Sequence, residues 1–575
     1  MSRWYLVGFL SLIAISYFRI SPVYDAYGVT YDEPFHLGCG LAALSGLTDN
    51  YSVEQPPISK LPESLAFFLG GVRSYGLENE FAEGLAVLTS RGRLDKDLAM
   101  ARRCGFFFVV IAAVAIFGWT REMFGTAPAF LALLLYTLLP TVLANAALAT
   151  TDHPFTAMLT LAFWAIWRWQ VNPRSLGRAA IAGLAVGLAV ATKFSAIPFL
   201  AAGLLLAFAW QWILRKRADE EDANEADAFS LFERGRLIMV SVALCFIAIW
   251  AAYMFESVPL RKAILLRDWA ATLPPGETFT DFANAALDVP IPAGRLLFGL
   301  YAVAGHARDG HPAYLFGMHS VRGWWYFFPI ALAIKTPIPF LVLALTGAWQ
   351  LLRRSFARNL PRLAMPVIFA AGILLACMAS TLNLGTRHIL PIYPLLAMMG
   401  GWAICELWRW RSAPFVYRGA LAAMLAWLVW NSVDAQPRYL SWFNELAPAD
   451  PSAALVGSDL DWGQDLKSLG RVLRERRIPA IALYYFGKDR PEYYYDGVVK
   501  EYLAETSSPE DWVAISVSWL RIDPSRFRAL KDRPFEMVGD SIRLYPPRTG
   551  VRPSRERSRD TSSVAKSAFP PPETR

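Results

Sequence analysis

The sequence of 575 residues is poor in charge, cysteine and histidine. Only 18% of its residues are charged and 55% are hydrophobic, whereas about 25% charged residues is usual for a soluble domain. These proportions exclude a compact cytosolic enzyme, a coiled coil and, over most of the length, a disordered chain. Five dispersed cysteines without a CxxC pair indicate neither a disulfide framework nor a structural zinc site.

Long apolar segments fill the chain instead, with 21 Trp, 22 Tyr and 36 Phe among its residues. A membrane span needs about 20 apolar residues. The pattern predicts eleven spans, and no small-residue cleavage site follows the first, so we expect it to be an uncleaved anchor. The spans are expected near 4–20, 105–120, 127–143, 154–169, 177–192, 196–214, 237–255, 325–351, 363–381, 389–408 and 416–432.

The distribution of Arg and Lys predicts the orientation of these spans. The net charge is +8, but seven cations against three acids lie from Arg548 onward, and much of the rest falls between apolar segments. This placement favours membrane topology over nucleic-acid binding. With a cytoplasmic N-terminus, 17 Arg and Lys lie on the cytoplasmic side, and the three short connections opposite hold only Lys193 and Arg387.

The fold class is therefore an α-helical polytopic membrane protein with a small α/β domain on the outer side. Residues 1–432 form the transmembrane domain, with long outer loops at 21–103 and 256–323. Two short apolar stretches, 35–47 and 61–72, are expected to lie in the interface as amphipathic helices. Residues 433–545 are typical of a soluble domain, with a helix near 464–476 and strands at 480–486 and 512–519. The basic tail 546–575 should be disordered.

Two polar clusters follow the first span. Asp32-Glu33 lies at a predicted membrane surface, where neighbouring carboxylates can act as base and as orienting group or metal ligand. The alternative is an ordinary helix N-terminus, with acids in its first turn. Glu54-Gln55-Pro56-Pro57 then stiffens a loop that ends at Lys60, either to hold these charges or for structural reasons alone.

Cations and histidines on the outer side form the remaining candidates. Asp152 opens the fourth span, as a helix cap or as part of a site. Lys193 and Arg387-His388 lie at span ends, where cations either snorkel or bind a lipid-linked phosphate. Lys335, a few residues inside the eighth predicted span, is a further candidate for the phosphate. The spacing of His306, His311 and His319 matches no zinc signature.

These motifs resemble the GT-C fold membrane glycosyltransferases, in the branch of protein O-mannosyltransferases and the lipid A aminoarabinose transferase. The resemblance spans roughly residues 1–430, and the soluble end is similar to the C-terminal domain of a subset of bacterial relatives. The motifs that carry it are Asp32-Glu33, Glu54-Gln55-Pro56-Pro57, Thr151-Asp152, Thr192-Lys193, Trp324-Trp325-Tyr326, Lys335-Thr336-Pro337, Arg387-His388-Ile389-Leu390-Pro391 and Asp459-Leu460-Asp461-Trp462.

The resemblance implies transfer of a sugar, with inversion, from a polyprenyl-phosphate carrier on the outer face of a bacterial inner membrane. It implies no nucleic-acid partner and leaves the acceptor, a lipid, glycan or protein, undetermined. Gln55 stands where relatives usually have His or Lys, which leaves the acceptor type and a divalent metal open. The implied site residues are Asp32 and Glu33 for catalysis, Arg387, Lys193, Lys60 and Lys335 for the carrier phosphate, Asp152 and His388 as further polar groups, and Glu54 and His319 for a metal.

Two other classes of protein are weighed against this reading. A secondary transporter should show repeats and ionisable residues near the bilayer middle, whereas the polar residues here gather at the outer ends of spans. A non-catalytic assembly protein could use the soluble domain, but it would leave Asp32-Glu33 without a role. The sequence therefore favours a membrane glycosyltransferase.

Overall fold

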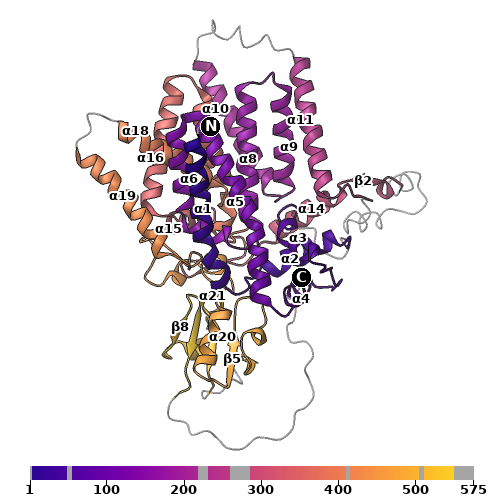
Figure 1. Ribbon diagram of the computed structural model, residues 1–575, viewed down its shortest axis with the longest axis vertical. Coiled ribbons are helices and arrows are strands. Elements are labelled where there is room, and N and C mark those ends of the chain that lie inside the picture. Colours follow the sequence, from indigo (N-terminus) through magenta and orange to yellow (C-terminus); the bar gives the residue numbers. More distant parts are fainter. Residues whose placement is uncertain are drawn as a thin grey trace, which may run out of the picture.

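A computed structural model describes residues 3–47, 55–217, 231–259, 285–409, 415–503 and 511–548. A bundle of long helices makes up one part of the molecule, and a small sheet domain adjoins one end of it (Figure 1). Helix α1 (Arg3–Ala26) begins at the end of the bundle away from the sheet (Figure 1). The predicted fold class is confirmed.

Each predicted span contains a helix or a pair of helices. Among the described residues, five helices are long and apolar enough to cross a membrane, or up to seven segments if two bent pairs each count as one span. The protein is therefore a multi-pass membrane protein. The elements are α1, α5 (Leu94–Phe124), α6 (Thr126–Thr137) with α7 (Pro140–Ala146), α8 (Asp152–Val171), α9 (Leu176–Val190), α10 (Ala196–Arg217), α11 (Leu231–Ala252), α15 (Phe327–Lys335) with α16 (Ile338–Ala357), α17 (Met365–Met378) after the 3-10 turn η5 (Pro361–Ala364), α18 (Ile392–Arg409) and α19 (Phe415–Asp434).

The segment predicted as a span at 325–351 is not one straight helix. Helices α15 and α16 meet at an angle of 119°, with Thr336 and Pro337 in extended conformations between them. A proline disfavours helical geometry in the residue before it, so the helix stops at Lys335. Hydropathy stays high on both sides of the bend and therefore does not reveal it. Lys335 consequently ends a short helix and does not lie inside a straight span.

Glycines allow neighbouring spans to approach closely. A Cβ atom at Gly183 of α9 would lie 2.1 Å from the carbonyl oxygen of Ser241 on α11. One at Gly347 of α16 would lie 2.0 Å from the carbonyl oxygen of Met399 on α18. Lipid offers little hydrophobic drive for helix association, so close backbone packing through small residues holds such bundles together.

The first outer loop folds into α2 (Glu33–Leu44), α3 (Leu61–Leu69) and α4 (Glu80–Thr89). Helix α2 was expected to lie in the membrane interface, but it is buried around most of its circumference, between α3 and α4. Its glycines explain this, because a Cβ at Gly38 would lie 2.6 Å from the Glu80 carbonyl oxygen. Likewise, a Cβ at Gly40 would lie 2.6 Å from the carbonyl oxygen of Lys60. Helix α2 is therefore packed against α3 and α4, and it does not lie at the membrane interface as predicted.

The second outer loop contributes two small hairpins and a helix. Strand β1 (Ser257–Pro259) pairs antiparallel with β2 (Pro290–Pro292), and β3 (Ala313–Leu315) pairs antiparallel with β4 (Met318–Ser320). Helix α14 (Gly294–Asp309) lies between the hairpins in sequence. Phe316 in the turn of the second hairpin donates its N–H to the Ala454 carbonyl, which ties this loop to the C-terminal domain.

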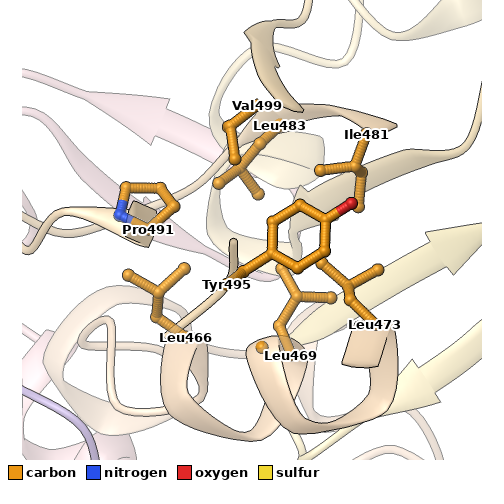
Figure 2. A pocket seen from close by; sticks show the side chains of 9 residues that line it. Leu466, Leu469, Leu473, Ile481, Leu483, Pro491, Tyr495 and Val499 are labelled. Carbon is orange, nitrogen blue, oxygen red and sulfur yellow. The ribbon is translucent and has the colours of Figure 1, made fainter. Parts of the chain in front are cut away.

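The C-terminal domain holds a five-stranded sheet in the order β6-β5-β7-β9-β8. Strands β5 (Ala480–Tyr484), β6 (Val498–Glu501) and β7 (Val513–Ser516) are parallel to one another. Strand β9 (Ile542–Tyr545) pairs antiparallel with β7, and β8 (Glu536–Val538) pairs antiparallel with β9. Helix α20 (Leu466–Glu475) matches the predicted helix, and α21 (Val517–Ile522) follows β7. Side chains of α20 and the sheet fill the space between them (Figure 2), leaving a cavity of about 10 Å³. This space holds no more than a water molecule. The predicted tail lies outside the described residues from 549 onward.

Candidate active site

Four charged side chains from separate elements meet beside the C-terminal domain. Asp32 precedes α2, Asp152 begins α8, Lys193 lies between α9 and α10, and Arg387 lies in the 3-10 turn η6 (Thr386–Ile389). The Arg387 Nη1 atom is 2.5 Å from Oδ2 of Asp32 and 3.8 Å from Oδ2 of Asp152. The Lys193 Nζ atom is 2.5 Å from Oδ1 of Asp152. We call these four residues the charge cluster.

The two carboxylates of the cluster do not serve as helix caps. Thr151 is the N-cap of α8, and Asp152 is its first residue, with its side chain turned to Lys193. Asp32 occupies the N-cap position of α2 but makes no capping hydrogen bond with its side chain. The explanation of Asp152 as a cap is therefore wrong. Both carboxylates face cations.

Arg387 is held in place from three directions. Its Cζ atom lies 4.4 Å from the centre of the Trp462 ring, and its Nε donates to the Leu384 carbonyl at 3.4 Å. The preceding Thr386 donates its N–H to Asp459 at 3.0 Å. Burial lowers the pKa of Arg387, but the carboxylates of Asp32 and Asp152 outweigh it and raise the pKa overall. The guanidinium is therefore charged.

Glu33 turns away from the charge cluster. Its two oxygens accept from Nε and Nη2 of Arg102, both at 2.7 Å, and from the N–H groups of Thr30 at 2.8 Å and Ala149 at 3.0 Å. Both side chains of the Glu33–Arg102 pair are fully buried. Burial raises the pKa of Glu33, but Arg102 and these hydrogen bonds lower it more, so Glu33 is charged. It orders the loop that carries Asp32 and cannot contact a substrate in this arrangement.

Lys335 is also used within the protein. Its buried Nζ donates to the carbonyls of Leu440 at 2.8 Å, Trp442 at 2.6 Å and Asp459 at 2.7 Å. It lies 4.1 Å from the centre of the Phe443 ring. An ammonium group has three N–H donors, and all three are occupied here. Lys335 therefore joins the end of α15 to the C-terminal domain, and we do not retain it as a ligand for the carrier phosphate.

Lys60 and two histidines surround the charge cluster. Lys60 donates to the Gln55 carbonyl at 2.9 Å and lies 5.2 Å from the centre of the Phe35 ring. Burial lowers the pKa of His36 well below its usual range, and Lys60 lowers it further. The pKa of His388 is likewise lowered by burial and by the nearby cations. Both imidazoles are neutral at pH 7, so the positive charge around the site comes from Lys and Arg.

The structure describes only one of the two residues expected to bind a metal. Glu54 lies outside the described residues, and His319 is exposed on β4, with its ring 5.4 Å from that of Tyr314. Across the part of the chain that the structure describes, no group of three or more His, Cys, Asp or Glu side chains could hold a metal ion.

A cavity of about 370 Å³ lies beside Lys60. The loop that carries Lys60 is fixed to the turn that carries Lys193, because the Ile58 N–H donates to the Ala191 carbonyl at 3.1 Å. The Glu256–Arg295 ion pair, with an Nε–Oε2 distance of 2.7 Å, forms part of the opposite wall. Small residues of α2 leave the space open. The lining residues include Gly40, Ala42, Ala43, Gln55, Lys60 and Tyr253.

Sequence reasoning missed three residues that build the site. Arg102 was not singled out, and nothing in its local sequence identifies Glu33 as its partner. Asp459 and Trp462 belong to a segment in which acids, glycine and tryptophan alternate from residue 459 to 465. Such a density of acids around a tryptophan could have drawn attention to it, but not to Arg387, which lies far away in sequence.

A comparison with protein families bears on the same residues. Residues 94–219 match the family model described as dolichyl-phosphate-mannose-protein mannosyltransferase. Over this segment the chain is similar to that family. The match includes Arg102, Asp152 and Lys193, and it confirms over this segment the resemblance drawn from the polar motifs. No curated protein matches the sequence.

Solved structures give weaker likenesses. ArnT from Cupriavidus metallidurans bound to undecaprenyl phosphate is 13% identical, with a TM-score of 0.49, over 95% of this chain and 98% of that one. The oligosaccharyltransferase AglB from Archaeoglobus fulgidus, in complex with an inhibitory peptide and a dolichol-phosphate, is 14% identical, with a TM-score of 0.45, over 82% of this chain and 58% of that one. The Archaeoglobus fulgidus oligosaccharyltransferase in complex with Zn and sulfate gives a TM-score of 0.42. Because none of these scores reaches 0.5, the similarity to the mannosyltransferase family rests on residues 94–219 alone.

Proposed function

We propose that this protein is an inverting glycosyltransferase that moves a sugar from a polyprenyl-phosphate carrier to an acceptor at the outer face of the membrane. The observation that carries the proposal is the charge cluster at the ends of membrane helices. A cavity lined by Lys60 lies nearby, because the Lys60 loop is hydrogen-bonded to the turn that carries Lys193. The family match over residues 94–219 supports the same reaction class. The fold, a multi-pass helical bundle, suits a substrate whose carrier is a membrane lipid.

The carrier phosphate is assigned to Arg387, Lys193 and Lys60. A sugar phosphate bond breaks readily once the charge on the departing phosphate is stabilised by fixed cations. A guanidinium can bind phosphate oxygens in bidentate fashion, whereas the two lysines supply point charges. Within the described residues Nη2 of Arg387 has no hydrogen-bond partner, so one edge of its guanidinium can face a ligand. Asp152 keeps Lys193 in position.

Asp32 is assigned as the catalytic base. It is partly exposed and touches Arg387, whereas Glu33 beside it is enclosed. In the proposed step the acceptor oxygen attacks the anomeric carbon of the sugar, and its proton passes to the Asp32 carboxylate. The bond between that carbon and the phosphate oxygen breaks, and polyprenyl phosphate leaves with the electron pair. Attack opposite the leaving group inverts the configuration.

The Asp32–Arg387 ion pair joins the proposed base to the proposed phosphate ligand. A donor phosphate that binds Arg387 competes with the Asp32 carboxylate for the same guanidinium. Binding of the donor would therefore release Asp32 from its partner and make it available to the acceptor. This order, donor before acceptor, follows from the contact itself. His388 lies beside Arg387 and, being neutral, adds no charge to the phosphate site.

A transporter explains these contacts less well. Transport sites are expected near the bilayer middle, on broken helices with ionisable residues. Here the charge cluster lies at helix ends, next to a soluble domain whose Trp462 touches Arg387. The described residues do not fit a metal centre, and no step of the proposed reaction passes through a metal.

The finer parts of the proposal concern the sugar, the acceptor and the membrane. We propose a hexosyl or pentosyl donor, a lipid, glycan or protein acceptor, and a location in a bacterial inner membrane with residues 433–545 outside the cytoplasm. A reporter enzyme that is active only after export, fused after Leu455, should be active. Activity of a cytoplasm-only reporter at the same position would contradict this topology.

The reaction is tested with purified protein in lipid, radiolabelled polyprenyl-phosphate sugars from membrane extracts, and the Asp32→Asn variant. Asn keeps the shape of the side chain but cannot accept the proton. Loss of a general base typically slows the chemical step by about 10²–10⁴-fold, while donor binding should persist because it rests on the cations. Transfer by Asp32→Asn within a few-fold of the wild-type rate would exclude Asp32 as the base.

A further inference from the structure

A short segment of the C-terminal domain joins the two loops that carry Asp32 and Arg387. We call residues 458–464 the clasp. On one side, the Ser458 hydroxyl donates to the Leu384 carbonyl at 2.6 Å, and Asp459 accepts from the Thr386 N–H and hydroxyl. These bonds fix the position of η6, in which Arg387 directly follows Thr386. The clasp therefore fixes the backbone from which the Arg387 side chain projects.

On its other side, the clasp holds the loop between α1 and α2. The Trp462 carbonyl accepts from the Tyr31 N–H at 2.9 Å, and the Gln464 carbonyl accepts from the Gly28 N–H at 2.9 Å. Tyr31 directly precedes Asp32. One seven-residue segment is thus hydrogen-bonded to Tyr31 and Thr386, the residues that directly precede the two partners of the Asp32–Arg387 ion pair.

The clasp is itself rigid. The Gln464 amide accepts from the Trp462 N–H at 2.7 Å and donates to the Leu460 carbonyl at 2.8 Å. Asp461 accepts from the Ser518 N–H of α21 at 3.1 Å, which connects the clasp to the sheet domain. Each of these polar clasp side chains is buried. Their buried hydrogen bonds define one conformation for the segment.

The loop opposite the clasp is shaped to receive it. Gly385 has a φ of 104°, in the region that favours glycine, and a Cβ there would lie 2.5 Å from the Ser458 hydroxyl oxygen and 2.9 Å from Oδ2 of Asp459. Any larger residue would push η6 away from the clasp. The two segments therefore fit only at this close distance.

We infer that the clasp belongs to the active site: Trp462, whose ring lies against the Arg387 guanidinium, is a further specificity residue for the carrier phosphate, and Asp459 is a positioning residue that acts through Thr386. The ring faces the guanidinium and leaves its edge open to phosphate. This inference rests on the proposed function and extends it, because the soluble domain then takes part in donor recognition.

The inference is tested by binding of polyprenyl phosphate, with dephosphorylated polyprenol as the matched probe. A buried cation–π contact typically contributes enough to change affinity by about 5–30-fold. Trp462→Leu should raise the Kd for polyprenyl phosphate by about this factor and leave the Kd for polyprenol unchanged. Trp462→Phe keeps an aromatic face and should stay within about 3-fold of wild type. In transfer assays the donor KM should rise more than kcat falls.

Two controls separate recognition from general loss of stability. Trp512→Leu makes the same change elsewhere in the C-terminal domain, because Trp512 packs with the core between α20 and the sheet and not against η6. This variant should leave the Kd for polyprenyl phosphate unchanged even if its melting temperature falls. Should Trp462→Leu not fold, Asp459→Asn replaces it, with Asp540→Asn as its control, because Asp540 pairs with Arg438 and not with η6. Asp459→Asn should raise the Kd for polyprenyl phosphate, and Asp540→Asn should not.

The outcomes are distinguishable from failure of the proposed function. A wild-type protein that neither binds polyprenyl phosphate nor transfers sugar contradicts the proposed function and, with it, the role of the clasp. A wild-type protein that does both, alongside folded Trp462→Leu and Asp459→Asn variants with unchanged Kd, overturns the inference alone. Equal losses for polyprenyl phosphate and polyprenol would also overturn it, because the phosphate would then not be the group that is recognised.

Discussion

Two buried glutamates of the first outer loop should respond in opposite ways to the same substitution. Glu33 is charged and bonded to Arg102, whereas burial raises the pKa of Glu63 on α3 well above its usual range. Within the described residues neither carboxyl oxygen of Glu63 has a hydrogen-bond partner. Glu63 is therefore protonated at pH 7. Gln resembles a protonated Glu in shape and charge, so Glu63→Gln should be nearly neutral.

Glu33→Gln should be strongly destabilising. Gln removes the negative charge and places an NH₂ group where one carboxylate oxygen accepts hydrogen bonds, so Arg102 is left as an unpaired buried cation. Breaking a buried ion pair by removing one partner typically costs about 3–5 kcal/mol. At about 1.4 kcal/mol per factor of ten, the opening equilibrium of this loop should rise by roughly 10²–10⁴-fold.

Hydrogen exchange followed by mass spectrometry measures this opening directly. The Thr30 and Ala149 amides donate to Glu33 in the native state, so peptides that contain them should lose protection in Glu33→Gln and keep it in Glu63→Gln. Peptides from α10 and α17 serve as internal references. Equal protection of the Thr30 and Ala149 amides in both variants would refute the assignment of Glu33 as the charged anchor of this loop.

Three further predictions follow from the contacts around the site. Arg387→Ala should weaken donor binding more than Arg387→Lys, because Lys keeps the charge but loses the bidentate fork; equal Kd values for both variants and the wild type would leave snorkelling as a sufficient explanation. Lys335→Met should lower the melting temperature by leaving three buried carbonyls without donors, while donor affinity in the folded fraction stays unchanged; a selective loss of affinity would restore Lys335 as a phosphate ligand. Burial raises the pKa of Asp461 to about 7 and of Asp465 to about 6, from 3.8. Since a raised pKa favours the protonated form in the folded state, the stability of the C-terminal domain should fall as pH rises from 5 to 8, and in Asp461→Asn this fall should be smaller; an identical pH profile of the two melting temperatures would contradict the raised pKa.

Much of the architecture follows from one-dimensional signals. Apolar stretches located the helices, and the Arg and Lys asymmetry singled out Lys193 and Arg387 as cations in unusual places. Both now lie in the charge cluster. What the pattern could not supply is pairing: Asp32 and Arg387 lie 355 residues apart, and the packing of four separate elements decides that they meet.

Residues that look alike in the sequence also have different surroundings in the structure. Asp32 and Glu33 are adjacent acids, but one faces Arg387 and the other is enclosed with Arg102. Lys335 resembled the other candidate cations until the bend after it placed its ammonium among three carbonyls. In each case the deciding partner is a buried backbone group or a distant side chain. Hydropathy and charge counts contain neither.

The clasp has a consequence for biogenesis. Its Trp462 lies 430 positions after Asp32 in the chain, and Arg387 also arrives late. At synthesis rates of about 5–20 residues per second, about 20–90 s pass between the synthesis of Asp32 and that of Trp462. During this interval the nascent chain holds a membrane domain without a finished centre. A ribosome that stalls before residue 458 therefore releases a product without the clasp, and the proposed sugar transfer can begin only after residues 458–464 have been made and folded.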